Sequence, residues 1–370
     1  MAPEISITRG HAFAWVIEAR ACKARRFGGM VVAFRTGITV TRLARCAIPV
    51  LLLPAIAAGT PPDPFAWLQP VAAMDAGARI RLDRGEVIVG VLPAADAEIG
   101  IFAASRLNAD GEMLAAWAES IAQLKKSPYV LVVRRFSDPP SIDDVQDMTL
   151  DDTDLETLRG CRAGDCDMKM AAEDIVSLRQ SAEAGGAFWK DAVQQQFRRV
   201  VFNRLQAYRA DGFEGLPLYA DRRKPIDPKA AFTSILGRSP YLTSDAFADA
   251  DIESFFYWSK EQYGAGKPVI SVTHVDIVRP RLPSALRMAM VSREILATHY
   301  RNASLGLTAV SEDGEGQRYL VYVNRSQLDV LGGLFGGWKR AIVEGKLKNE
   351  SADVFREVRR RLESGPPPSD

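Results

Sequence analysis

Residue types and motifs that mark several common functions are scarce or missing in this chain of 370 residues. It has four cysteines and three histidines, so few residues are available for a metal centre built on these ligands. It contains no G-x-x-x-x-G-K-S/T loop and no G-x-G-x-x-G turn, so no motif supports nucleotide binding. It also lacks the G-x-S-x-G elbow, which argues against a serine hydrolase built on Ser304 and His299.

Long apolar runs are missing as well. The apolar run at residues 47–58 covers about 12 residues, whereas crossing a bilayer takes about 20. The preceding residues 35–45 carry three arginines and no acid, and the run ends in Ala-Ile-Ala-Ala. A basic region, a short apolar region and small residues at the end are typical of a secretory signal peptide. We therefore predict a signal peptide over residues 30–58, cleaved near Ala57 or Ala58, and a periplasmic or secreted protein.

Nothing in residues 1–29 is needed for such a signal. We expect Met30 to be the true start and residues 1–29 to be a mis-assigned extension. The proline-rich residues 59–75 are expected to form an extended leader into the fold. Residues 366–370 are expected to be a disordered tail.

The balance of charge excludes one class of partner. The whole chain has 47 basic and 46 acidic side chains, and residues 1–58 contain eight of the basic and two of the acidic ones. The remainder carries 39 basic and 44 acidic side chains, a net charge of −5. Nucleic-acid binding needs clustered Lys and Arg to neutralise phosphates, so we expect no nucleic-acid partner. The sequence leaves the oligomeric state open.

Cys161 and Cys166 are the two cysteines that remain after removal of the expected signal, in the motif Cys-Arg-Ala-Gly-Asp-Cys. In an oxidising compartment the default for such a pair is a disulfide. A redox couple has less support because the spacing is not C-x-x-C. A zinc site would need two more ligands, and none lies nearby in the sequence. We predict a structural disulfide, no metal, and no cofactor for the chain.

Hydrophobic periodicity predicts an α+β chain of two domains. Residues 76–250 are expected to form an N-terminal domain of α/β type, with a loop at 221–241 near its end. Residues 251–365 are expected to form an antiparallel sheet closed by a long terminal helix. The expected strands are 79–93, 98–107, 129–136, the aromatic run 254–258, 269–278, 295–303, 305–310 and 319–323, and the expected helices are 111–126, 171–210 and 331–362.

The order of elements over roughly residues 252–363, several strands and then one long helix, resembles the helix-grip fold of START-like lipid-binding domains. This resemblance rests on element order alone. It implies a curved antiparallel sheet and a C-terminal helix that together enclose an apolar cavity.

Four short motifs carry a second resemblance. They are CRAGDC at 161–166, YWSKE at 257–261, THY at 298–300 with ASLG at 303–306, and VNRS at 323–326. They are similar to motifs of a family of uncharacterised exported bacterial proteins. The resemblance covers most of the chain after the signal peptide and implies no particular activity.

Two histidines, His274 and His299, remain for catalysis or metal binding. His274 and Asp276 alternate along an expected strand, so both side chains project from one face. With Glu261 or Glu294, the histidines supply the ligand types of a zinc site or of a hydrolase of the cell envelope. The alternative is that each histidine is a hydrogen-bonded polar residue of a half-buried sheet. The spacing matches no known ligand motif, so an enzyme is the second hypothesis.

The stretch from Asp329 to Arg340 contains four glycines within a helical pattern of apolar residues. A helix start with so many glycines either flexes or approaches another backbone closely. We interpret it as a lid over an apolar pocket, as a contact with a membrane surface, or as a terminal helix packed on the sheet.

The leading hypothesis is an exported, non-enzymatic protein that binds an apolar or lipid-like small molecule in the C-terminal domain. His274, His299 and Arg325 would orient the head group of this ligand. The third hypothesis is a structural or interaction protein whose partner covers the glycine-rich helix. The residues expected to form the binding site are Phe255, Tyr257, Trp258, Leu334, Phe335, Trp338 and Arg325.

Overall fold

The structure is a computed structural model, and it describes residues 63–69, 74–95, 97–263, 266–331 and 336–368. The expected signal peptide and the extension before it lie outside these residues. Leu334 and Phe335 lie outside them too, as does the side chain of Trp338. Within the described ranges, every helix is too short or too polar to cross a bilayer.

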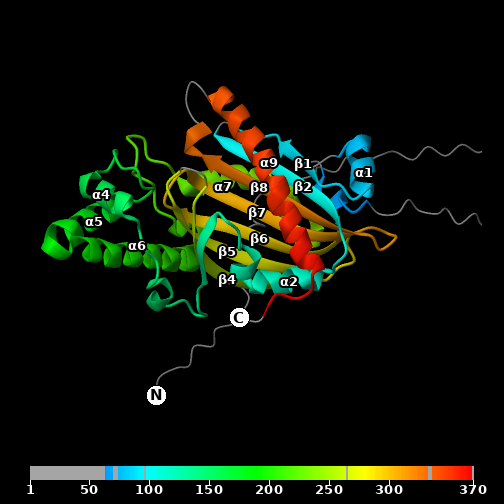
Figure 1. Ribbon diagram of the computed structural model, residues 1–370, viewed down its shortest axis with the longest axis horizontal. Helices are drawn as coiled ribbons and strands as arrows, with labels where there is room; N and C mark the ends of the chain where they lie inside the picture. Colours follow the sequence, from blue (N-terminus) through cyan, green and yellow to red (C-terminus); the bar gives the residue numbers. More distant parts are fainter. Residues whose placement is uncertain (1–62, 70–73, 96, 264–265, 332–335, 369–370) are drawn as a thin grey trace, which may run out of the picture. The chain divides into compact units, whose positions relative to one another are not determined.

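Eight antiparallel strands form one open sheet (Figure 1). Their order across the sheet is β1-β2-β8-β7-β6-β5-β4-β3, so the sheet has two free edges and is not closed into a barrel. Together with the helices, this sheet confirms the predicted α+β class. The strands are β1 (Ile88–Leu92), β2 (Glu98–Leu107), β3 (Val130–Arg135), β4 (Ala250–Glu261), β5 (Val269–Pro280), β6 (Leu286–Ala297), β7 (Arg301–Glu312) and β8 (Arg318–Leu328).

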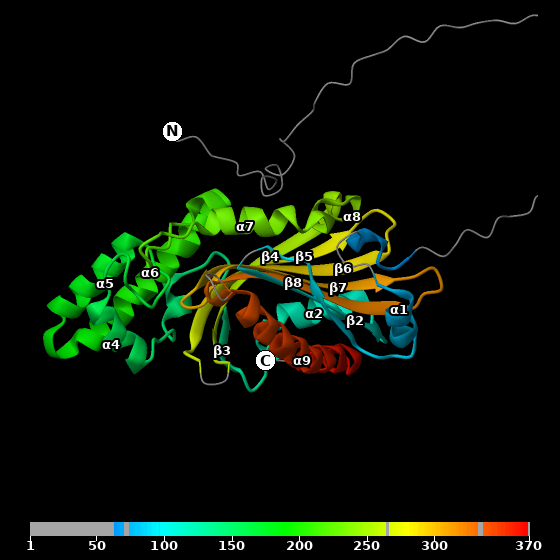
Figure 2. The same cartoon turned by 90° about the horizontal axis from the view of Figure 1, so that it is seen from above.

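Helices cover both faces of the sheet, as the two views in Figures 1 and 2 show. The α9 face is covered by α2, α3 and α9, and the opposite α7 face by α6, α7 and α8. The α-helices are α1 (Ala76–Asp83), α2 (Gly111–Glu119), α3 (Ile121–Leu124), α4 (Asp152–Gly160), α5 (Ala172–Ala184), α6 (Trp189–Asp211), α7 (Pro228–Gly237), α8 (Asp245–Ala248) and α9 (Gly336–Glu363). Short 3-10 helices are η1 (Ala66–Leu68), η2 (Ile142–Val145), η3 (Gly186–Phe188), η4 (Gly212–Gly215), η5 (Pro240–Thr243) and η6 (Asp329–Leu331).

Strand alternation separates the core into two clusters, because successive side chains point to opposite faces. On the α9 face, Phe255 and Tyr257 of β4 belong to the same cluster as Trp117 of α2 and Phe355 of α9. On the α7 face, Trp258 of the same strand belongs to the cluster that includes residues of α6 and α7.

The expected domain boundary near residue 250 falls between two strands that are neighbours in the sheet. Strand β3 pairs with β4, although helices α4 to α8 separate them in the sequence. The described residues from 63 to 368 belong to one compact unit. Helices α4, α5 and α6 project beyond one end of the sheet (Figure 1).

Three sequence-based assignments of local structure are wrong. Residues 76–83 are helical, because Asp75 caps helix α1 by accepting a hydrogen bond from the backbone N–H of Ala78. The expected strand over 295–303 is interrupted by a turn at 298–300, where Tyr300 has a positive φ of 66°. The loop expected at 221–241 contains helix α7, which starts with Pro228 after the N-cap residue Asp227.

Candidate functional site

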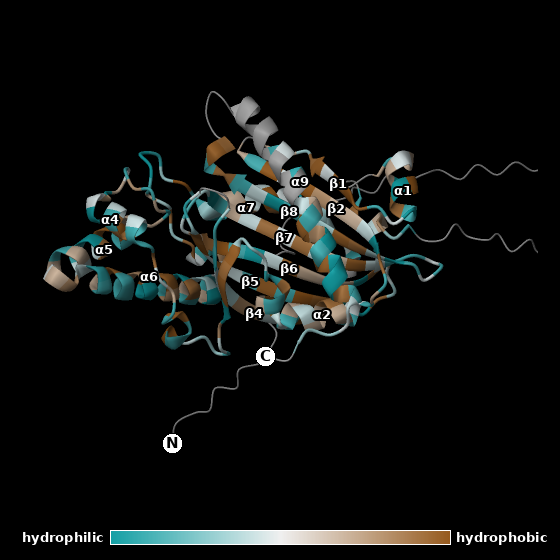
Figure 3. Cartoon of the chain, viewed as in Figure 1, coloured by the Kyte–Doolittle hydropathy of each residue, from teal (hydrophilic) through white to brown (hydrophobic). Residues whose placement is uncertain are grey.

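The α9 face of the sheet has an apolar half and a polar half. In the apolar half, Met288, Val310 and Leu320 are buried against α2 and the C-terminal part of α9. A sheet face covered by helices is ordinarily apolar throughout, because buried polar groups must be paired at a cost in desolvation. The other half departs from this rule. Figure 3 shows that hydrophilic and hydrophobic residues occur along the same strands.

The polar half lies toward the β4–β5 and β6–β7 turns. The strand register places Tyr257, Thr273, Glu294, Ser304 and Ser326 side by side across five strands, from β4 to β8. Because Tyr257 faces α9, its cross-strand neighbours in this row face α9 as well. Neighbouring rows add further polar groups. The polar half consists of Lys125, Tyr257, Ser259, Glu261, Tyr263, Ser271, Thr273, Ser292, Glu294, Arg301, Ser304, Tyr322, Asn324 and Ser326.

Glu261 is the most heavily bonded group in the polar half. Its Oε1 lies 2.6 Å from Lys125 Nζ and accepts a hydrogen bond from the Ser259 hydroxyl at 2.8 Å. Its Oε2 accepts a hydrogen bond from the Tyr263 hydroxyl at 2.7 Å. Burial alone would raise the pKa of Glu261, but the charges of Lys125 and Arg301 hold it at about 2. Glu261 is therefore a carboxylate at neutral pH.

A second ion pair completes the charge balance. Arg301 Nε donates to Glu294 Oε1 at 2.6 Å. Burial opposes the charge of Arg301, but Glu294 and Glu261 raise its pKa above the ordinary value. The polar half thus holds two cations and two carboxylates, each with its counter-charge in contact. The side chains of Lys125 and Arg301 are 26% and 18% exposed, so solvent reaches this cluster.

Three hydroxyl groups of the polar half are free. Within the described part of the chain, no hydrogen bond joins the side chains of Thr273, Ser292 or Tyr322 to another group. Thr273 is nevertheless only 4% exposed. Burial raises the pKa of Tyr322 to about 12, so its phenol keeps its proton and can donate. The Ser292 Oγ lies over Gly306, only 2.5 Å from where a Cβ at that position would be.

Aromatic residues surround the ion pairs at the turns. The rings of Tyr129 and Tyr263 stack at 5.5 Å between centroids. The Tyr300 hydroxyl accepts a hydrogen bond from the backbone N–H of Lys267, which ties the β6–β7 turn to the β4–β5 turn. Lys125 Nζ lies over the ring of Tyr257 at 5.2 Å.

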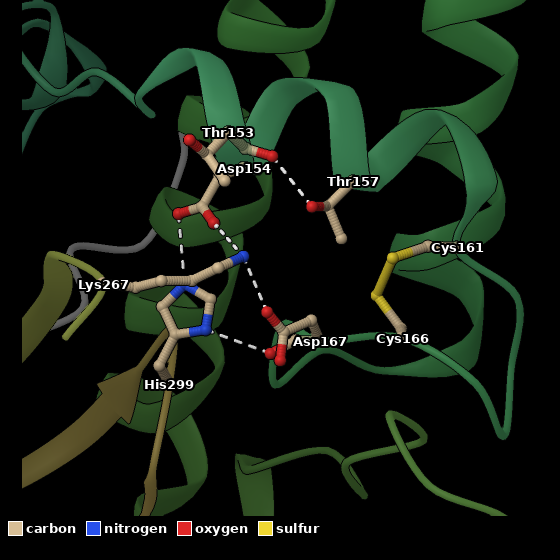
Figure 4. The surroundings of a disulfide bond; sticks show 8 residues. All are labelled: Thr153, Asp154, Thr157, Cys161, Cys166, Asp167, Lys267 and His299. Carbon is tan, nitrogen blue, oxygen red and sulfur yellow. Dashed lines mark hydrogen bonds and ion pairs between the residues drawn. A yellow bond between two sulfur atoms is a disulfide. The ribbon is translucent and has the colours of Figure 1, made fainter.

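His299 lies in a different network, near the disulfide (Figure 4). Its Nδ1 donates to the backbone carbonyl of Asp167 at 3.0 Å, and its Nε2 lies 3.1 Å from Asp154 Oδ2. Both ring nitrogens therefore lie within hydrogen-bonding distance of an oxygen atom. Burial would raise the pKa of Asp154, but His299 and Lys267 lower it. Because His299 is only 2% exposed and fully bonded, its role is to join helix α4 to the β6–β7 turn.

His274 lies on the α7 face and forms a third network. Its Nε2 lies 3.2 Å from Asp276, so the sequence-based placement of these two side chains on one face is confirmed. Its Nδ1 accepts a hydrogen bond from the Tyr208 hydroxyl at 3.1 Å, and its ring stacks on Phe256. His274, His299 and Glu261 therefore do not form one catalytic or metal site. Among the described residues, no group of three or more His, Cys, Asp or Glu side chains is placed to hold a metal ion.

The residues expected to line one apolar pocket are also separated. Phe255 and Tyr257 face α9, whereas Trp258 points to the α7 face, where its Nε1 donates to the carbonyl of Asp144 at 2.9 Å. Arg325 is buried in an ion pair with Glu98 at 2.9 Å and cannot orient a ligand beside Tyr257. Strand alternation is the reason, since adjacent residues of β4 cannot share a pocket on one side of the sheet.

The predicted disulfide between Cys161 and Cys166 is confirmed, with the two Cα atoms 4.6 Å apart. The loop that it closes is held by backbone bonds from Gly164 to Ala220 and from Cys166 to Asp221. The carbonyl of Asp167, one residue further, accepts the hydrogen bond from His299 (Figure 4). The disulfide thus fixes the loop that receives His299.

A separate hollow of about 430 Å³ lies at the opposite end of β7 and β8. Its arginines are already engaged, Arg79 with Asp63 and Arg106 with the carbonyl of Asp83. The hollow is an open surface depression between charged side chains, so we do not place the candidate site there.

Comparisons with known proteins do not assign the chain to a family. No family model matches the chain, and the comparisons with curated proteins and with solved structures gave no significant match.

Sequence reasoning found Tyr257, Glu261 and Glu294 but missed Lys125, Thr273, Arg301 and Tyr322. One signal was available for part of this set. Ser259 and Glu261 alternate in β4, as Ser292 and Glu294 do in β6, which places polar residues at positions of one face. Lys125 had no such signal, because it follows helix α3, more than a hundred residues before Glu261.

Proposed function

We propose that this chain is a binding protein that holds a small molecule against the polar half of the α9 face. The observation that carries the proposal is a row of polar side chains across the sheet face, in which the hydroxyl groups of Thr273, Ser292 and Tyr322 make no hydrogen bond to another described group. None of these hydroxyls is a fully buried atom without a partner, so all three are open to pairing with the polar groups of a ligand.

The order of the elements supports the START-like interpretation. Strands β4 to β8 follow one another as antiparallel neighbours, and α9 comes directly after them and crosses one face (Figure 1). We place the ligand on that same face, beneath α9. The lipid-like part of the hypothesis depends on Leu334, Phe335 and Trp338, whose side chains are outside the described residues. We therefore propose a ligand with polar groups, and a lipid would bind with its head group at Lys125 and Glu261.

Export of the protein remains part of the proposal. It is supported by the signal-like pattern at residues 30–58 and by the Cys161–Cys166 disulfide, since disulfides persist mainly in oxidising compartments.

The test is native mass spectrometry of the full chain, expressed with export and purified without detergent. A discrete adduct that dissociates when the protein unfolds is the expected result. The Thr273→Val, Tyr322→Phe double variant should lose this adduct, because it removes two free hydroxyls with little change in volume. Its matched control is Thr233→Val, Tyr241→Phe, which removes hydroxyls from α7 and η5.

The result that would contradict the proposal is equally definite. A bare protein mass for the wild type, or an adduct retained equally by both double variants, would exclude the polar half as the binding site. Thermal unfolding of each variant shows whether a lost adduct reflects lost binding or lost structure.

A further inference from the structure

We propose that the part of the ligand in contact with the polar half is uncharged and rich in hydroxyl groups, as in a sugar or another polyol. This inference rests on the proposed binding function and narrows it to a ligand class. It depends on two independent features of the polar half, its charge balance and the chemistry of its free groups.

The charge balance disfavours a ligand with a net charge. Lys125 is neutralised by Glu261 and Arg301 by Glu294, each at 2.6 Å. Among the described residues of the polar half, no cation is left without a carboxylate. An anionic ligand would have to displace Glu261 or Glu294 from its partner, which would leave a carboxylate desolvated and unpaired. A cationic ligand would have the same effect on Lys125 or Arg301.

The free groups favour a partner that both donates and accepts hydrogen bonds. Thr273 and Ser292 carry aliphatic hydroxyls, each with one donor and two acceptor positions, and Tyr322 carries a phenol. Nearby hydroxyls of Ser304 and Ser326 already bond to each other at 2.8 Å, and the Asn324 amide donates to Ser304 at 3.3 Å. A polyol presents the same mixture of donors and acceptors and can join this network without introducing a charge.

One aromatic side chain is also available on this face. The half-buried Tyr322 lies beside the row of hydroxyls, whereas Tyr257 is 5% exposed and its ring is covered by Lys125. The C–H groups of a sugar ring can pack against Tyr322 while its hydroxyls meet Thr273 and Ser292. A hydrocarbon chain could use the aromatic ring but would leave these hydroxyls unpaired.

Isothermal titration of the full chain tests this class. The probes are glucose, N-acetylglucosamine and myo-inositol, with glucose 6-phosphate and decanoate as charged or apolar counterparts. We expect at least one uncharged probe to bind, and we expect both counterparts to bind at least about tenfold more weakly. Thr273→Val should weaken the binding of the uncharged probe by up to about tenfold, which corresponds to the loss of one hydrogen bond. Thr233→Val should leave the affinity unchanged.

The possible outcomes distinguish a failure of the proposed ligand class from a failure of the proposed binding function. Tighter binding of glucose 6-phosphate or decanoate than of every uncharged probe would overturn the ligand class. Failure of all three uncharged probes would overturn it as well, whereas an adduct retained from the expression host would still support the binding function. Uncharged binding that Thr273→Val leaves unchanged would overturn the assignment of this ligand to the polar half.

Discussion

Lys125 Nζ lies 2.6 Å from Glu261 Oε1, and this contact joins the end of helix α3 to the end of strand β4. The pair sits in the polar half of the α9 face, beside the β4–β5 turn. Glu261 also accepts hydrogen bonds from Ser259 and Tyr263, so one carboxylate contacts three other side chains. Removing its charge should therefore affect both stability and the geometry of the candidate site.

Glu261→Gln should lower the free energy of unfolding by about 2–3 kcal/mol at pH 7, because it leaves Lys125 without a counter-charge in a largely buried position. Urea denaturation of wild type and variant measures the difference. Glu253→Gln is the matched control on the same strand, since Glu253 is exposed and pairs only with Arg279 on the surface. Equal stability of wild type and Glu261→Gln would contradict a stabilising role for the pair.

The same carboxylate predicts a pH dependence. The pKa of Glu261 is lowered from 4.5 to about 2 in the folded protein. A lowered folded-state pKa stabilises the protein above the unfolded-state value, and this contribution is lost as the pH falls through 4.5 toward 2. The stability difference between wild type and Glu261→Gln should therefore shrink between about pH 5 and pH 2. Denaturant titrations at several pH values test this, and a constant difference would contradict it.

His299→Gln should destabilise the protein by about 2–3 kcal/mol, since it removes a buried side chain that bonds to both Asp154 and the Asp167 carbonyl. His274→Gln should cost less, because the His274 side chain is 18% exposed and its partner Asp276 keeps Arg293 and Ser254. Chemical denaturation of the two variants gives the comparison. A larger loss of stability for His274→Gln would show that the contribution of the His299 network to the free energy of unfolding is smaller than we expect.

Sequence patterns were informative where apolar residues fill a whole element, and they failed where a local signal is short. Strand β2 occupies the predicted range 98–107, in which apolar residues predominate and nine of the ten positions are buried. Helix α1 was missed because two apolar residues, Ile80 and Leu82, also fit a strand, and the Asp75 cap decides the outcome. The β6–β7 turn was missed because apolar residues flank it on both sides.

The candidate site was harder to predict because it is assembled from distant segments. Lys125, Glu261 and Arg301 come from α3, β4 and β7, and only the strand order brings them together. The aromatic run at 255–258 was correctly assigned to a strand. Its alternation, applied to each residue, would already have assigned Tyr257 and Trp258 to opposite faces.

Replacing both Cys161 and Cys166 by serine should lower the free energy of unfolding by about 2 kcal/mol, as expected for a short closed loop. Reduction of the wild type with dithiothreitol should produce a similar loss and should leave the double variant unchanged. Combination with His299→Gln should be less than additive, because the disulfide loop carries the Asp167 carbonyl that His299 meets. Strict additivity would show that the loop and the histidine act independently.

Gly306→Ala tests the packing of the polar half directly. A Cβ at this position would lie 2.5 Å from the Ser292 Oγ, so Ser292 has to move or the strands have to part. We expect a loss of about 1–3 kcal/mol in the free energy of unfolding. Gly90→Ala in β1 is the matched control, since nothing lies within 4 Å of its added Cβ. Adding Ser292→Gly to Gly306→Ala should recover most of the loss, because it removes the clashing hydroxyl. If the double variant stays as unstable as Gly306→Ala, the cost comes from the backbone rather than from this contact.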